Sequence, residues 1–118
     1  MARRIDHVLH DMLQAIGYAV ESAAGKNVSD FETDWKFRLT FERALEILSE
    51  ASRSLPKAQK AIHPEIDWLG LQDLGNILRH RYDSVSGHVL LQIVEEQLPS
   101  LQRALIDIKN KRNNDGQK

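Results

Sequence analysis

The sequence predicts an all-α fold, an up-and-down bundle of four to five helices joined by short loops. Apolar residues recur at intervals of three and four along most of the 118 residues, and no long segment alternates with period two. Only three prolines and six glycines interrupt this pattern. A chain of this length forms one domain, which we place at residues 1–111, followed by a polar tail at 112–118.

The first helix is predicted from an apolar stripe that contains Ile5, Val8, Leu9, Met12, Leu13, Ile16 and Val20. Gly25 is placed to end it in the left-handed conformation. Ser-Asp-Phe-Glu at 29–32 has the pattern of a capping box, with Ser29 as the N-cap and Glu32 as its partner. The helix that follows is expected to bend at 33–36 and to end at Pro56.

Shorter segments connect this helix to the last one. Residues 57–63 predict a short helix that stops before Pro64, because a residue preceding proline avoids the helical region. Asp67 is expected to cap a helix that begins at Trp68. Residues 83–87, Asp-Ser-Val-Ser-Gly, predict a turn.

The last helix is expected to begin near Ser86 or Gly87. Its apolar stripe keeps phase across Pro99, which predicts one helix kinked at Pro99 rather than two helices. The stripes together predict six core residues: Leu45, Leu48, Leu74, Ile77, Leu90 and Ile93.

Composition excludes several classes of function. The 16 Lys and Arg residues balance 17 Asp and Glu residues, which excludes a chain that binds nucleic acid over its whole surface but permits a local basic patch. The absence of cysteine excludes a disulfide framework and a thiol nucleophile, and it fits a reducing cytoplasm, where we expect the protein. No apolar stretch is long enough to span a membrane, and no glycine-rich loop is present to hold phosphates.

Neither a cofactor nor a metal ion is expected. His7 and His10 could share an ion at helical spacing, but the pattern supplies no third ligand, so a solvated face is the better interpretation. The aromatic residues Phe31, Trp35, Phe37 and Phe41 could stack bases. Packing in the core or in a dimer is the expected role for three of these four.

Polar and ionisable side chains are densest in residues 76–83, at the predicted C-terminal end of a helix. His80 lies between Arg79 and Arg81, whose like charge favours the neutral imidazole, whereas the carbonyl end of the helix favours the protonated form. Asn76 shares a face with His80, one turn earlier. A neutral histidine beside guanidinium groups suits metal-free RNA cleavage through the 2′-hydroxyl, and the alternative is a cationic helix end that complements its dipole.

Three blocks follow one another in the second half of the chain: Pro-Glu-Ile-Asp-Trp at 64–68, Leu-Gly-Asn-Ile-Leu-Arg-His-Arg-Tyr at 74–82 and Gln-Leu-Pro-Ser-Leu at 97–101. Their order and spacing resemble the HepT-like family of the HEPN superfamily. The earlier stretch Arg-Ala-Leu-Glu-Ile-Leu-Ser-Glu-Ala at 43–51 is similar to the second helix of that family.

The resemblance implies a HEPN-like bundle that forms a homodimer through its motif helices and acts as a metal-independent endoribonuclease, leaving cyclic phosphate ends on RNA. It also implies the toxin of a toxin–antitoxin module. The implied partner is a minimal nucleotidyltransferase antitoxin, which silences such toxins by transferring AMP to a tyrosine.

The family signature is arginine, four residues, histidine, one residue, tyrosine. His80 and Tyr82 match it, and Asn76 matches the asparagine that usually follows the arginine. The resemblance therefore implies a catalytic role for His80, with Asn76, and AMP transfer to Tyr82. The chemistry of the motif adds a catalytic role for Arg79 and a substrate-binding role for Arg81, because guanidinium groups can hold phosphate. A tyrosine that packs its ring under the following turn is the alternative for Tyr82.

The signature arginine belongs at position 75, where this sequence has Gly75. Either Arg79, one helical turn later, substitutes for it, or catalysis is lost and a HEPN-fold binding module remains that partners a nucleotidyltransferase. A glycine inside a helix indicates close helix approach, which we place at the dimer seam. A third interpretation is an interaction bundle with no link to RNA.

Overall fold

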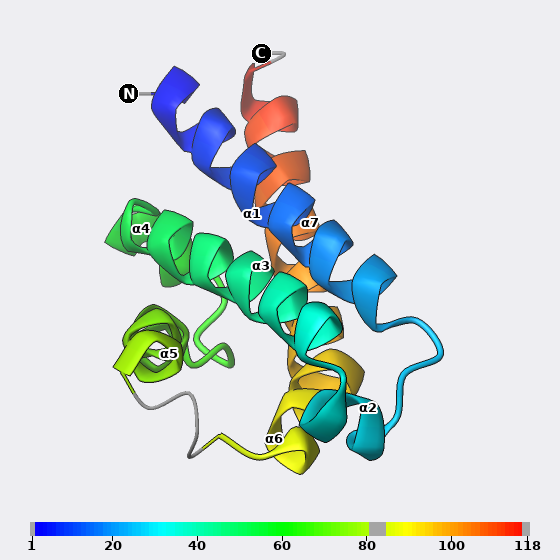
Figure 1. Ribbon diagram of the computed structural model, residues 1–118. Helices are drawn as coiled ribbons and strands as arrows, with labels where there is room; N and C mark the ends of the chain where they lie inside the picture. Colours follow the sequence, from blue (N-terminus) through cyan, green and yellow to red (C-terminus); the bar gives the residue numbers. More distant parts are fainter. Residues whose placement is uncertain (1, 81–84, 117–118) are drawn as a thin grey trace.

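The computed structural model describes residues 2–80 and 85–116, and within these ranges every element is helical (Figure 1). The elements are α1 (Ala2–Ala23), α2 (Val28–Thr33), α3 (Trp35–Arg53), α4 (Lys57–Lys60), α5 (Trp68–His80), α6 (Gly87–Gln92), η2 (Ile93–Gln97) and α7 (Leu98–Gly116). The predicted all-α class is therefore confirmed. No helix in the described ranges is long and apolar enough to cross a membrane.

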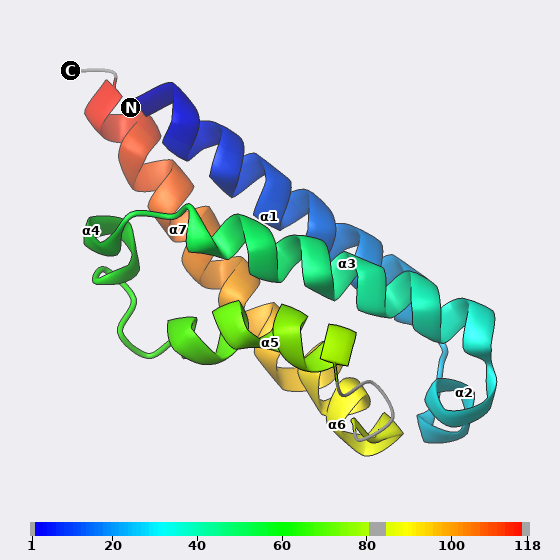
Figure 2. The same cartoon turned by 60° about the vertical axis from the view of Figure 1, so that its left-hand side comes forward.

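The core lies between the long helices. α1 packs along α3 and against α7, and α5 packs on α3 (Figure 2). Each long helix is amphipathic and turns its apolar stripe inward. The large side chains that are fully buried are Leu9, Met12, Ile16, Phe31, Phe41, Leu45, Leu48, Leu55, Leu90, Leu105 and Ile108.

Most of the predicted core is confirmed. Leu45, Leu48, Leu90 and Ile93 are buried, and Leu74 is half-buried against them. Ile77 was wrongly assigned to the core, because 39% of its surface is exposed. On α5 the inward stripe continues from Leu74 to Leu78, one turn later, and Ile77 lies just outside it.

The connection between α1 and α2 begins as predicted, since Gly25 has a positive φ of 76°. The capping box, however, begins at Asn27 rather than at Ser29, so that expectation was wrong. Asn27 Oδ1 accepts a 3.0 Å hydrogen bond from the amide of Asp30, and Asp30 Oδ2 accepts one of 2.9 Å from the amide of Asn27. Asparagine caps as well as serine does and precedes it by two residues, so Ser29 falls inside α2.

The predicted bend at 33–36 is confirmed. α2 ends at Thr33, and Asp34 has a non-helical backbone with φ −91° and ψ 88°. Its Oδ1 accepts a 3.2 Å hydrogen bond from the amide of Phe37, which starts α3. Further along, the short helix predicted over 57–63 is limited to Lys57–Lys60.

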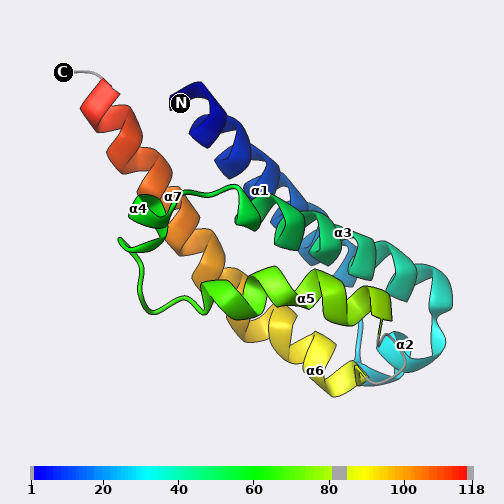
Figure 3. The ribbon, with the colours of Figure 1, turned by 90° about the vertical axis from the view of Figure 1, so that its left-hand side faces the viewer.

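The last helix begins where the sequence predicts, with Ser86 Oγ accepting a 3.2 Å hydrogen bond from the amide of Val89. It runs on through Pro99 as α6, η2 and α7 (Figure 3). The irregular turn lies just before the proline, where the amide of Leu98 bonds the carbonyl of Ile93 five residues back. This wide turn accommodates Pro99, which has no N–H to donate.

The last helix extends into the segment where we expected a polar tail, residues 112–118. α7 continues to Gly116. Arg112 Nε donates a 2.9 Å hydrogen bond to Asp6 Oδ1 on α1. The first and last helices are therefore joined near both termini.

Candidate functional site

The helix that carries the motif begins at a side-chain cap and is fixed along one face. Asp67 Oδ1 accepts a 2.9 Å hydrogen bond from the amide of Gly70, as the sequence predicts. Farther along, Ser49 Oγ on α3 donates a 2.9 Å hydrogen bond to the carbonyl of Gln72 and accepts one of 3.1 Å from the amide of Gly75. α5 is thus bonded through its backbone to a buried hydroxyl.

Gly75 explains why α3 and α5 approach so closely. A Cβ at this position would lie 2.9 Å from Ser49 Oγ and 3.2 Å from Ser49 Cβ, which leaves no room for a side chain. We expected Gly75 at a seam between two chains, and that expectation was wrong. Its contact is with α3 of the same chain, so the position of the family arginine faces the interior.

Three catalytic candidates lie on the surface at the C-terminal end of α5. Asn76, Arg79 and His80 are all exposed. Arg79 Nη2 donates a 2.7 Å hydrogen bond to Asn76 Oδ1. The His80 imidazole makes no hydrogen bond to any described residue. Arg81 and Tyr82, the other two candidates, lie outside the described residues.

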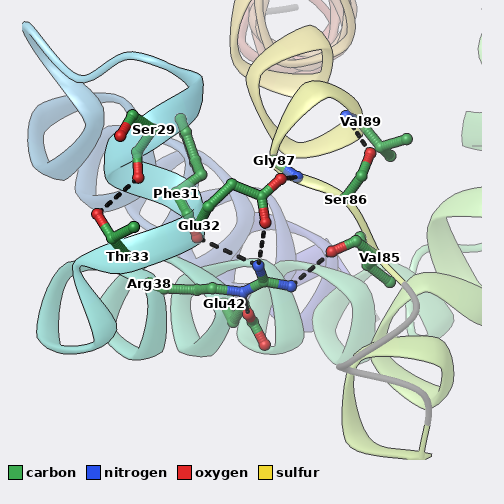
Figure 4. A network of polar contacts seen from close by, with 10 residues as sticks. All are labelled: Ser29, Phe31, Glu32, Thr33, Arg38, Glu42, Val85, Ser86, Gly87 and Val89. Atoms are coloured by element: carbon green, nitrogen blue, oxygen red, sulfur yellow. Dashed lines mark hydrogen bonds and ion pairs between the residues drawn. The ribbon is translucent and has the colours of Figure 1, made fainter.

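A polar network fixes the chain where it resumes after the motif (Figure 4). Arg38 Nη2 on α3 donates a 2.6 Å hydrogen bond to the carbonyl of Val85, and Nη1 donates one of 3.1 Å to the carbonyl of Phe31. Nε of the same guanidinium lies 2.6 Å from Glu42 Oε2 in a largely buried ion pair. One side chain therefore joins α2, α3 and the segment before α6.

A second contact in the same network acts on α6 directly. Glu32 Oε1 accepts a 2.8 Å hydrogen bond from the amide of Gly87. Gly87 packs so closely that a Cβ would lie 2.9 Å from the carbonyl oxygen of Val28. The start of α6 is thus held against α2. Hydrogen bonds therefore attach the chain to α2 and α3 on both sides of residues 76–83, at Gly75 before them and at Val85 and Gly87 after them.

Sequence reasoning missed Ser49 and Arg38 as supports of this region. The spacing of Arg38 and Glu42 on one helix could have indicated an ion pair. Nothing local indicates that the guanidinium also reaches Val85, 47 residues away, or that Ser49 reaches Gly75.

The aromatic residues separate into two groups. Phe31, Phe37 and Phe41 form a buried cluster, with ring centroids 4.8 Å and 5.2 Å apart in the two edge-on pairs. This confirms packing for three of the four. Trp35 points away from them and is 66% exposed.

Histidines elsewhere take different roles. His63 lies between two carboxylates, with Nδ1 2.7 Å from Glu65 Oε2 and Nε2 2.8 Å from Asp107 Oδ2. Hydrogen bonds that the protonated imidazole donates to Glu65 and Asp107 raise the pKa of His63. His7 and His10 are exposed on α1. No cluster of three metal-ligating side chains occurs in the described parts of the chain.

Comparison with known proteins supports the resemblance to the HepT-like family that the sequence motif indicates. The family model described as "Ribonuclease HepT-like" matches residues 12–108. A protein of Thermococcus cleftensis named "Probable ribonuclease HepT" is 37% identical over 101 residues, which cover 86% of this chain and 92% of that protein. No solved structure gives a significant match.

Two further relatives carry names that describe them as candidate RNases. One, from Caldanaerobacter subterraneus, is 27% identical over 87% of this chain and 92% of its own length. The other, from Methanocaldococcus jannaschii, is 29% identical over 86% of this chain and 93% of its own. With the family model spanning most of the chain and near full-length relatives, the chain belongs to the ribonuclease HepT-like family of the HEPN superfamily.

Proposed function

We propose that this protein is a metal-independent endoribonuclease. The observation that carries the proposal is the pairing of Arg79 with Asn76 at 2.7 Å on the exposed helix end that also carries His80. Together they supply an imidazole for proton transfer and a guanidinium for phosphate charge at one end of α5. The relatives that bear RNase names cover nearly all of the chain, so this helix is within the shared region.

The chemistry follows from these groups. His80 takes the proton of a ribose 2′-hydroxyl, and the oxygen attacks the adjacent phosphorus. The bond from phosphorus to the 5′-oxygen breaks, and that oxygen takes up a proton from an imidazolium. The products are a 2′,3′-cyclic phosphate and a 5′-hydroxyl. Arg79 stabilises the added negative charge at phosphorus, and Asn76 holds the guanidinium in place.

We propose further that the active unit is a homodimer. One outward row on α5 contains Leu69, Asp73, Asn76, Ile77 and His80, spaced for a single helical face. Leu69 is 75% exposed and Ile77 39%, and apolar side chains gathered on one face favour a partner. Pairing two such faces would bring one His80 from each chain into a shared cleft, one as base and the other as acid.

The same proposal includes regulation. Tyr82 follows His80 by two residues, so AMP on its hydroxyl would add a bulky anion beside the proposed site and exclude RNA. The enzyme that transfers AMP would be a nucleotidyltransferase antitoxin. This protein would be the toxin of the pair, acting in the cytoplasm on cellular RNA.

Two measurements test these proposals. Purified protein in EDTA should cleave RNA to products with 2′,3′-cyclic phosphate ends, and His80→Ala should not; cleavage that survives His80→Ala would contradict the site. Intact mass spectra of the protein expressed alone and beside its neighbouring gene should differ by one or more AMP units, located on Tyr82. Equal masses would contradict the proposed regulation.

A second function is favoured by the contact between Gly75 and Ser49. Because no side chain fits at position 75, the family arginine is absent and has no space in this packing. The protein could then be a HEPN-fold binding module that partners a nucleotidyltransferase without cleaving RNA. A stable complex with that enzyme, together with RNA left intact, would favour this function over the nuclease.

A further inference from the structure

A groove with an apolar floor and a cationic rim lies between α3 and α5 and reaches the proposed site. Its volume is about 670 Å³. Trp35, Leu39 and Arg43 line it from α3, and Leu78 and Arg79 line it from α5; we call it the Trp35 groove. Arg79 therefore belongs both to the groove and to the proposed nuclease site.

Apolar side chains form the floor of the groove: Trp35, Leu39 and Leu78. Trp35 is 66% exposed and Leu39 is 60% exposed, one turn apart on α3. Lys36 Nζ lies 5.7 Å from the centroid of the Trp35 ring and forms a cation–π pair with it. The indole is thus a flat, accessible surface with a cation beside it.

Positively charged side chains outnumber negatively charged ones in the groove. Each carboxylate that lines it is matched by a guanidinium: Glu42 by Arg38 at 2.6 Å. Glu46 is matched by Arg43 at 3.2 Å. Lys36 and Arg79 form no ion pair with any residue in the described ranges. The side chain of Arg43 is 70% exposed, and an exposed ion pair is weak enough to exchange its carboxylate for a phosphate.

We propose that the Trp35 groove binds single-stranded RNA, with one base stacked on Trp35 and the neighbouring phosphates on Arg43 and Arg79. The proposal rests on the ribonuclease function proposed above and assigns it a substrate subsite. An aromatic face with cations beside it is what a single strand requires, since every base has a flat apolar face and every linkage an anion. Trp35 and Arg43 are separated by about 12 Å along α3, at 1.5 Å per residue.

Protein-binding surfaces differ from this groove in one respect. The centres of protein interfaces are depleted of charged residues, whereas three arginines and two glutamates line this groove and Lys36 lies beside Trp35. The direct continuity with Arg79 favours the substrate of the proposed site over a separate protein partner.

The test uses the full chain with His80→Ala, so that RNA is bound and not cleaved. The probe is a fluorescein-labelled single-stranded RNA of about 12 nucleotides that contains all four bases. Trp35→Ala should weaken its binding by roughly 5-fold to 150-fold, the range expected for loss of one stacked base, and Trp35→Phe should restore most of the affinity. Ile106→Ala, at an exposed apolar residue on α7, should leave the affinity unchanged.

Two further readouts report on the contact itself. RNA should quench tryptophan emission in the parent and not in Trp35→Phe, where Trp68 is the tryptophan that remains. Arg43→Ala should lower the slope of log affinity against log salt by about 0.7, as for one phosphate contact on a single strand. Arg103→Ala, an exposed arginine on α7, is the matched control and should leave that slope unchanged.

The outcomes separate this inference from the function on which it rests. If RNA is cleaved by the parent while Trp35→Ala binds and cleaves it normally, the subsite is wrong and the nuclease stands. If the parent neither binds nor cleaves RNA, both fail. A change of oligomeric state in Trp35→Ala by light scattering, without loss of RNA affinity, would identify the groove as an interface between copies. Equal competition by poly-glutamate would identify an acidic peptide site.

Discussion

The amide of Gly75 on α5 donates a 3.1 Å hydrogen bond to the hydroxyl of Ser49 on α3, and the missing side chain at position 75 is what permits it. Ser49 is itself buried and bonds the carbonyl of Gln72. The position where the family carries arginine is therefore a packing position in this chain. Any guanidinium in the proposed site has to come from elsewhere, and Arg79 is the arginine that α5 supplies.

We expect Gly75→Arg to destabilise the protein rather than to create nuclease activity. Its Cβ would lie within 3.2 Å of two atoms of Ser49, and overpacking of this kind costs about 1–3 kcal/mol in the free energy of unfolding. Urea denaturation measures this cost. Gly17→Ala is the control, because a Cβ at Gly17 on α1 meets nothing within 4 Å, so this change should stabilise the protein by about 0.5–1 kcal/mol. A stable, newly active Gly75→Arg protein would contradict the packing argument.

Arg38→Met should be among the most destabilising single changes in the chain. It leaves Glu42 buried and unpaired and removes the donors to the carbonyls of Val85 and Phe31. Breaking a buried ion pair on one side costs about 3–5 kcal/mol. Arg43→Ala on the same helix is the matched control, since its pair with Glu46 is exposed and should cost less than about 1 kcal/mol.

A second substitution, at Glu42, tests whether its unpaired charge causes the loss of stability in Arg38→Met. Combining Arg38→Met with Glu42→Leu removes the unpaired charge and should recover part of the lost stability, as coupled residues do not behave additively. If the double variant is as unstable as the sum of the single variants, the ion pair is not the source of the effect.

The sequence predicted the helices because their apolar periodicity is local and strong. It also placed the cap at Asp67 and the start of the last helix near Ser86 or Gly87, where a polar residue precedes an apolar run. It misplaced the cap at Ser29 because two overlapping capping patterns occur within three residues, and the earlier one, at Asn27, is the one that forms. Local signals of equal strength do not decide between neighbouring positions.

The candidate site was predicted in part. Asn76, Arg79 and His80 share the exposed end of α5, as their spacing indicates. The surroundings could not be predicted, because the contacts of Ser49 with Gly75 and of Arg38 with Val85 join residues far apart in sequence. Ile77 was misassigned for a related reason. Which face of a helix is buried depends on the position of the neighbouring helix, and the sequence does not give that position.

His63 should make stability depend on pH. Its pKa is raised above the ordinary value of 6.5 by the hydrogen bonds it donates to Glu65 and Asp107. It therefore stabilises the fold fully below pH 6.5 and loses this effect as the pH rises through its folded pKa. The pKa values of Glu65 and Asp107 are lowered, chiefly by His63, so their contribution is lost as the pH falls through those values. The link between the α4–α5 connection and α7 should be strongest in the mildly acidic range between these limits.

Thermal unfolding followed across this range checks the prediction. His63→Gln should lower the melting temperature most in the mildly acidic range and flatten the decline above pH 6.5. Asp107→Asn should remove part of the same dependence, because Glu65 still faces Nδ1. An unchanged profile in His63→Gln would show that the two carboxylates do not respond to its charge.

Arg79 and Asn76 should act as one unit in RNA cleavage. His80→Ala should lower kcat by about 10²- to 10⁴-fold, the contribution of a general acid–base group. Arg79→Ala should lower kcat because the guanidinium is lost, and Asn76→Ala should lower it less, because its amide only holds that guanidinium through the 2.7 Å hydrogen bond. The double variant should then be no slower than Arg79→Ala, since Asn76 has nothing left to position. Multiplicative losses in single-turnover cleavage would instead assign Asn76 a contact of its own with the RNA.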